Sequence, residues 1–286
     1  MNYIKCKRNE IDRCNICGLS SKLTWDHVPP KSALFERNIY ANTLFSQGKL
    51  PSTDCHMRRY QNGIKYRTIC EKCNNDILGR NDNIYKDFIY SVVAQLVNSD
   101  KESHGDPLFR PVVVETKINR LLRAICGHFL AMKTGYDDQT LVEECLREYV
   151  FDESMPLSGI KMFCWFYPYN TVLNVRDVAI LEGKENVHPR GLVSVMATFP
   201  LGFMISTEEE PECGVDELSK YSSGRIEDTV SISLSRDTLR YRGSKEWKHF
   251  EWPVNISNDK YGALGVSGTR ELIEGSRLGI KIPPTR

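Results

Sequence analysis

The sequence predicts an α+β protein in which a small, zinc-stapled domain is followed by a domain of helices and antiparallel strands. Two observations predict this order. Paired cysteines and turn residues fill the first third of the chain, whereas β-branched and aromatic segments dominate after Ile160. We therefore expect one domain at residues 1–97 and another at 112–286. The polar stretch 98–111 between them contains one glycine and two prolines, which is typical of a linker.

Helical periodicity occurs at three places along the chain. Apolar residues recur every four positions across 84–96, which predicts a helix after the second cysteine pair. Residues 118–134 present one apolar face and are followed by Gly135, a stop signal, so they predict an amphipathic helix. A further helix is expected over Asp138–Tyr149.

Six segments after residue 160 are short, rich in β-branched and aromatic residues, and separated by Gly, Pro or Asn, which is typical of strands. These segments are 161–169, 171–181, 191–199, 201–206, 228–234 and 249–254. We expect them to form an antiparallel sheet that packs against the helices at 118–134 and 138–149.

Charge and hydropathy indicate the cellular location and the kind of partner to expect. No apolar run approaches the roughly 18 to 20 residues that span a bilayer, and the N-terminus lacks the apolar core of a secretory signal. We therefore expect a cytoplasmic protein without a membrane partner. Residues 1–90 hold 15 Lys+Arg and 9 Asp+Glu, whereas the remainder is net acidic. The first part of the chain is thus the better suited to face a polyanion.

Four cysteines come in two Cys-x-x-Cys pairs, Cys14 with Cys17 and Cys70 with Cys73. In a reducing compartment such pairs indicate metal binding more than disulfides, and two of them can complete a tetrahedral Zn²⁺ site. The alternative is a set of unliganded cysteines with this spacing. Cys55 and His56, between the pairs, could join or replace a ligand. Four cysteines in the later part of the chain have no pair spacing and are expected to be small buried apolar residues: Cys126, Cys145, Cys164 and Cys213.

The sequence around these pairs resembles that of a known family. CNICG, WDHVPPKS and ICEKCNNDILG, in this order, resemble the zinc-knuckle variant of the HNH endonuclease superfamily, whose fold is called ββα-metal. The resemblance covers roughly residues 12–90. It implies that His27 is the general base, that Asp26 is a metal ligand, and that Asn74 is the second ligand, with Asn75 as the near alternative. It also implies a catalytic Mg²⁺ or Mn²⁺ beside the structural Zn²⁺.

Several residues near the motif stay open to two interpretations. The group that orients the His27 ring is either Asn62 or a backbone carbonyl. Asp82 is either a ligand carboxylate or a surface or capping residue, and His128 is expected to be packed in the core. Five basic residues between the motif and the helix either contact phosphates or form an ordinary solvated face. They are Arg58, Arg59, Lys65, Arg67 and Lys72.

The resemblance favours a metal-dependent endonuclease that hydrolyses nucleic-acid phosphodiester bonds, with DNA preferred because HNH enzymes usually cut DNA. Residues 112–286 would then bind a protein partner or an activating ligand, or supply targeting. By analogy of architecture, the chain would be the effector of a bacterial anti-phage defence or restriction system. The alternative is a zinc-knuckle module that binds nucleic acid or protein without cutting. Trp247, Phe250 and Trp252 could stack on bases, although a strand facing a core also explains them.

Overall fold

The structure is a computed structural model that describes residues 6–35, 38–42, 58–102, 111–136, 140–167, 171–182, 188–207, 215–235 and 262–266. The helical elements are η1 (Lys31–Ala33), η2 (Cys73–Leu78), α1 (Gly79–Glu102), α2 (Ile118–Met132), α3 (Leu141–Phe151) and η4 (Ser219–Tyr221). The first strands are β1 (Ile11–Arg13), β2 (Ser20–His27), β3 (Asn38–Asn42), β4 (Arg58–Gln61), β5 (Lys65–Cys70) and β6 (Val112–Lys117). The later strands are β7 (Lys161–Phe166), β8 (Thr171–Glu182), β9 (His188–Thr198), β10 (Leu201–Ser206), β11 (Asp216–Glu217), β12 (Thr229–Leu234) and β13 (Gly262–Val266).

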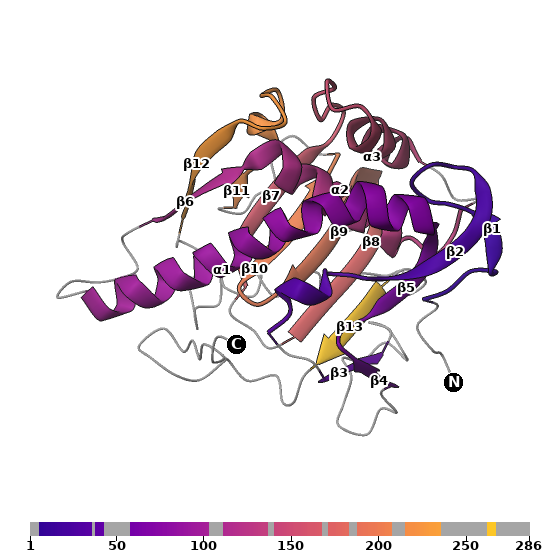
Figure 1. The fold of residues 1–286 in the computed structure, drawn as a ribbon, viewed down its shortest axis with the longest axis horizontal. Coiled ribbons are helices and arrows are strands. Elements are labelled where there is room, and N and C mark those ends of the chain that lie inside the picture. The colour runs from indigo at the N-terminus through magenta and orange to yellow at the C-terminus, as the bar shows by residue number, and fades with distance from the viewer. Residues whose placement is uncertain are drawn as a thin grey trace.

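An eight-stranded antiparallel sheet forms the centre of the molecule, in the order β11-β7-β10-β9-β8-β13-β3-β4. Helices α1 and α2 lie over the same face of this sheet (Figure 1). Apolar side chains on the central strands are buried on both faces, so that neighbours such as Phe203 and Met204 belong to two different core clusters. The α+β class with antiparallel strands is therefore confirmed.

A second, three-stranded antiparallel sheet, β1-β2-β5, lies beside the central one. Strand β2 pairs with β5 so that His27 is opposite Lys65, and a bulge interrupts the register between Thr24 and Trp25. The chain passes from β5 directly into η2 and α1. Two antiparallel strands followed by a helix therefore form around the residues that carry the HNH resemblance.

The packing does not follow the expected boundary between residues 97 and 112. Strands β3 and β4 belong to the N-terminal segment, yet β3 pairs with β13, which in turn pairs with β8 of the central sheet. One hydrophobic cluster contains residues of both segments, from Cys14 and Leu78 to Phe129 and Phe203. The part of the chain that the structure describes is thus built around a shared core.

The start of the expected linker is helical, because α1 continues to Glu102. Residues 98–102 are polar, but they contain neither glycine nor proline, so nothing in them stops a helix before Gly105. Polar composition was therefore a poor guide to the boundary. Residues 103–110 lie outside the described residues.

The other predicted elements agree with the structure within a few residues. The helices expected at 84–96, 118–134 and 138–149 correspond to α1, α2 and α3. Helix α3 begins at Leu141, because Thr140 and Glu143 form a capping box there. Five predicted strands correspond to β7, β8, β9, β10 and β12, but β12 pairs with β6 in a separate two-stranded ribbon. The strand predicted at 249–254 lies outside the described residues.

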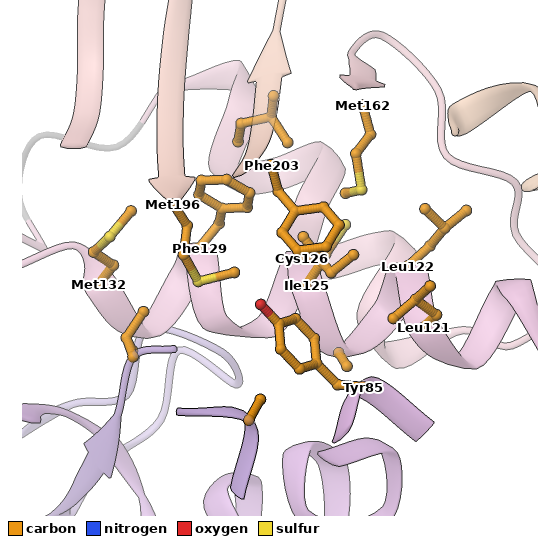
Figure 2. Packing of buried hydrophobic residues seen from close by; sticks show 14 of the residues in the cluster. Tyr85, Leu121, Leu122, Ile125, Cys126, Phe129, Met132, Met162, Met196 and Phe203 are labelled. Atoms are coloured by element: carbon orange, nitrogen blue, oxygen red, sulfur yellow. The ribbon is translucent and has the colours of Figure 1, made fainter. Parts of the chain in front are cut away.

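Helix α2 is the most deeply buried helix among the described residues, with fourteen of its fifteen residues buried. Figure 2 shows its side chains between Tyr85 of α1 and the strand residues Met196 and Phe203. At Gly127, α2 closely approaches the end of η2: a Cβ atom there would lie 2.0 Å from Leu78 Cδ2. Glycine at this position therefore permits the contact between α2 and η2, which runs directly into α1.

A network of buried charges joins the end of α2 to α3 and β8. Lys133 Nζ lies 3.0 Å from Glu143 Oε2 and 2.9 Å from Asp177 Oδ2, and the Arg176 guanidinium forms ion pairs with the same two carboxylates. Lys133, Glu143 and Arg176 are each at most 2% exposed. Burial raises the pKa of Asp177, but Arg176 and Lys133 overcome this effect and hold the pKa below its usual value.

Candidate functional site

The structure brings together the four cysteines that the sequence paired. The sulfur atoms of Cys14, Cys17, Cys70 and Cys73 all lie within 4.8 Å of one another, and Cys17 Sγ is 3.8 Å from Cys70 Sγ. A tetrahedral zinc ion with Zn–S bonds of about 2.3 Å separates its sulfurs by about 3.8 Å. The cluster therefore has the donor set and the spacing of a structural zinc site.

Each cysteine pair occupies a place where the backbone turns. Cys14 and Cys17 flank the turn after β1, which ends at Gly18 with a positive φ of 72°, and Cys70 and Cys73 join the end of β5 to η2. The Cys70 amide donates to Cys14 Sγ at 3.3 Å. Hydrogen bonds from the Cys73 thiol and from backbone amides lower the pKa of Cys14 to about 5. This environment favours a thiolate, which is the form that binds zinc.

Asn15, inside the first cysteine pair, anchors the cluster to α2. Its side-chain amide donates to the carbonyl oxygens of Leu130 and Lys133 at 2.8 and 2.6 Å, and its own carbonyl accepts from Arg147 Nε at 2.7 Å. The last carbonyls of a helix have spare acceptor capacity, and the Leu130 carbonyl accepts from the Lys133 amide as well as from Asn15. The cysteine cluster and the C-terminal end of α2 are therefore held together.

A cavity of about 480 Å³ lies at the end of β2. Its polar lining comes from β2, η1, the turn before β5 and α1, and consists of Asp26, His27, Lys31, Ser32, Asn62 and Asp82. Leu34 and the half-exposed ring of Tyr90 contribute apolar walls. Two carboxylates, an imidazole and a lysine therefore face one space.

His27 is the last residue of β2 and is half-buried in this cavity. Burial lowers the pKa of its ring, and the charge of Lys65 lowers it further. Its Nε2 atom is buried and makes no hydrogen bond within the described part of the chain. A neutral imidazole with an unused nitrogen is suited to accept a proton.

Asn62 and Gly63 form the turn that leads into β5, and both have positive φ, 61° and 98°. A Cβ atom at Gly63 would lie 2.4 Å from Leu34 Cδ1 and 3.9 Å from the His27 ring. The turn thus requires glycine and closes one side of the cavity. No hydrogen bond between Asn62 and His27 is present among the described residues, so the group that orients the ring stays a prediction.

His128, in the middle of α2, lies between the two aspartates of the cavity. Its Nε2 is hydrogen-bonded to Asp82 Oδ1 at 3.0 Å, and its Nδ1 lies 3.2 Å from Asp26 Oδ2. Burial lowers the pKa of His128, but the carboxylates of Asp82 and Asp26 overcome this and raise it to about 10. The expectation that His128 is packed in the core holds, since it is 0% exposed, but its two acidic neighbours were not foreseen.

Asn74 is not among the residues that line the cavity. Its side-chain amide donates to Thr24 Oγ1 and to the Trp25 carbonyl, each at 3.2 Å, which ties the start of η2 to the bulge in β2. Asn75, the alternative, is exposed. The structure therefore brings Asp26 and His27 together with Asp82, two helical turns beyond Asn74.

The predicted basic residues whose side chains the structure describes lie on β5 and at the start of η2. Lys65 is half-buried opposite His27, and Lys72 is exposed at the start of η2. Arg67 donates to the Arg8 carbonyl at 2.8 Å, and its guanidinium lies 5.5 Å from the centre of the Trp25 ring. The side chains of Arg58 and Arg59, in β4, lie outside the described part of the chain, as do Cys55 and His56.

The remaining expectations from the sequence have mixed outcomes. Cys126 and Cys164 are buried as predicted, whereas Cys145 is only half-buried. Cys213, Trp247, Phe250 and Trp252 lie outside the described residues. Among the helices that the structure describes, none is long and apolar enough to cross a membrane.

Comparison of the chain with protein-family models, with curated proteins and with solved structures found no match.

Proposed function

We propose that this chain is a metal-dependent endonuclease of the HNH type, which hydrolyses phosphodiester bonds of nucleic acid. The observation that carries the proposal is the cavity in which the half-buried imidazole of His27 faces the same space as the carboxylates of Asp26 and Asp82. Phosphodiester hydrolysis needs a base for the attacking water and a site for a divalent cation, and these residue types meet both needs.

The donor groups fit two kinds of metal. Four thiols within 4.8 Å suit zinc, and the cluster contributes to folding by joining two distant turns. Carboxylate oxygens suit Mg²⁺ or Mn²⁺, and the carboxylates of Asp26 and Asp82 line the same cavity. A divalent cation bound by these carboxylates would stabilise the negative charge that develops on the phosphate and the leaving oxygen.

The residues of the chain then have separate tasks. The imidazole of His27 accepts a proton from water, and burial beside Lys65 keeps that imidazole neutral at neutral pH. Asp26 and Asp82 bind the cation. Lys31, at the cavity wall, provides positive charge for a phosphate. Without a cation the two carboxylates would repel a phosphodiester, so we expect activity to depend on a divalent metal.

We propose DNA as the substrate because of the HNH resemblance, and the basic balance of residues 1–90 agrees with a polyanionic partner. The role of a bacterial anti-phage or restriction effector is proposed on the same resemblance. A protein partner or activating ligand would bind through residues 112–286.

The experiment compares wild type with His27→Ala on plasmid DNA, single-stranded DNA and RNA, each with Mg²⁺ or Mn²⁺. The matched control is Lys22→Ala, because Lys22 lies on the same strand with a side chain that is 75% exposed. We expect metal-dependent cleavage by wild type and by the control, and a loss of at least about a hundredfold in His27→Ala. Cleavage that survives in His27→Ala would show that the imidazole is not the base.

The rival function, a zinc-knuckle module that binds without cutting, would use the cysteine cluster alone. It predicts binding of labelled nucleic acid that is unchanged in His27→Ala and is lost when the zinc is removed. Tight binding with no cleavage under any of these conditions would favour that function over the nuclease.

A further inference from the structure

The close contact of α2 with the end of η2, which continues into α1, brings the cavity residues together with a residue of α2. Leu78 and Asp82 lie four positions apart across the junction of η2 and α1, so both face the same side of the helix. Gly127, which permits Leu78 to approach, directly precedes His128. The helix contact thus places the His128 ring beside Asp82, 46 positions away in the sequence.

The surroundings of His128 exclude contact with a substrate. Its side chain is 0% exposed, and both ring nitrogens face carboxylates that line the cavity from the other side. A buried polar ring is costly unless it is paired, and these two carboxylates are its polar neighbours. A histidine placed behind metal-binding carboxylates acts by fixing their orientation.

The two carboxylates retain donor atoms for a cation. The Asp26 side chain is 9% exposed, and its Oδ2 is paired with His128 Nδ1 at 3.2 Å, so its other carboxylate oxygen, Oδ1, is the donor atom proposed for a cation. The Asp82 side chain is 31% exposed and lines the cavity. Both groups therefore face a space that holds no other described carboxylate.

We propose that Asp82 and His128 complete the cation site: Asp82 is its second carboxylate ligand, and His128 is a positioning residue that holds Asp26 and Asp82. This proposal deepens the nuclease function and rests on it. It replaces Asn74, which the resemblance implied as the second ligand, and it adds a residue from outside the stretch that the resemblance covers.

The local helix geometry explains why Asp82 stands in place of Asn74. Residues Cys73–Leu78 form a π-helix, in which the Gly79 amide bonds to the Asn74 carbonyl, five positions back. Such a turn holds about one residue more than an α-helical turn, so eight residues complete roughly two turns from Asn74 to Asp82. Both residues then face β2, but Asp82 lies beside Asp26 and His128, whereas Asn74 lies beside Thr24 and Trp25.

The experiment measures Mn²⁺ affinity by electron paramagnetic resonance on the full-length, zinc-loaded chain, without nucleic acid. The variants are Asp82→Asn and His128→Gln. Two controls are Asn74→Ala and Asp87→Asn, the latter an exposed aspartate on the same helix. Zinc content and thermal midpoint are measured on each variant, so that loss of the fold is distinguished from loss of the site. If His128→Gln fails to fold, Asp82→Asn decides the result for the ligand.

We expect Mn²⁺ affinity to fall at least about tenfold in Asp82→Asn and about 10- to 100-fold in a folded His128→Gln, with zinc content unchanged. Both controls should bind Mn²⁺ as wild type does. The proposal is overturned if Asp82→Asn binds Mn²⁺ normally, if Asn74→Ala weakens binding instead, or if wild type binds none. It is overturned for His128 alone if the folded His128→Gln keeps normal affinity.

These outcomes separate this proposal from the proposed function. His27→Ala should keep its Mn²⁺ affinity while it loses cleavage. A wild type that binds Mn²⁺ through Asp82 but cuts no nucleic acid would leave the cation site in place and refute the nuclease. A wild type that cuts with Mn²⁺, together with an Asp82→Asn variant of normal affinity, would refute the site and leave the nuclease.

Discussion

Replacing Glu143 by glutamine tests the buried charge network. The carboxylate of Glu143 forms ion pairs with both Lys133 and Arg176, and its side chain is 1% exposed. Glutamine retains the shape of the side chain, and its amide oxygen can keep the capping box with Thr140. Its NH2 group then faces Arg176, so the substitution removes both the charge and the acceptor for the guanidinium. Lys133 and Arg176 would then share the single carboxylate of Asp177.

Breaking a buried ion pair from one side costs about 3–5 kcal/mol, because a buried charge loses its partner. A chain of this size loses roughly 2–4 °C in thermal midpoint per kcal/mol, so we expect the midpoint of Glu143→Gln to fall by roughly 6–20 °C. The matched control is Glu10→Gln. Glu10 pairs with Lys22 at 3.2 Å, but both side chains are well exposed, at 60% and 75%. Its loss should cost less than about 1 kcal/mol.

The measurement is thermal unfolding followed by circular dichroism at fixed zinc concentration. Removing the uncompensated charge in a Glu143→Gln, Lys133→Met double variant should restore part of the loss. A Glu143→Gln midpoint that falls no further than that of Glu10→Gln would refute the role of the network.

Three further results are expected. Replacing Cys73 by serine should reduce bound zinc, measured by atomic emission, because it removes one of the four sulfur ligands. It should also lower the thermal midpoint, because the cluster is anchored to α2 through Asn15, and an unchanged midpoint would contradict this. Phe129→Ala should cost about 3–5 kcal/mol in chemical denaturation because its side chain is fully buried, whereas Phe151→Ala, 49% exposed, should cost far less; equal losses would show that the core of α2 has been misplaced. Thr140→Ala should cost about 1 kcal/mol through the lost cap of α3, and an unchanged unfolding midpoint would argue against the capping box.

Local patterns in the sequence predicted the elements well where one physical signal dominated. The periodicity of residues 118–134 predicted α2, and a short apolar segment with an aromatic residue, preceded by proline, predicted β10 at 201–206. The cysteine spacing predicted a cluster that the structure assembles, because two Cys-x-x-Cys turns can converge only in a few ways.

Long-range contacts account for what the sequence did not reveal. The pairing of β3 with β13 joins residues more than 200 positions apart, and no local pattern specifies it. His128 was read as a packed residue, because a histidine among apolar neighbours carries no sign of which carboxylates it will meet. The π-helical turn at Cys73–Leu78 shifts the following residues around the helix, and no local pattern in the sequence predicts that turn.

The contact of Gly127 with Leu78 also restricts how such a chain can evolve. If another helix replaced α2, it would need a glycine opposite Leu78 and a histidine beside Asp82. Neither requirement is met by an arbitrary helix. We therefore expect the cysteine cluster and α2 to be inherited as one unit. A recombination event that preserves the cavity should have its crossover point after α2.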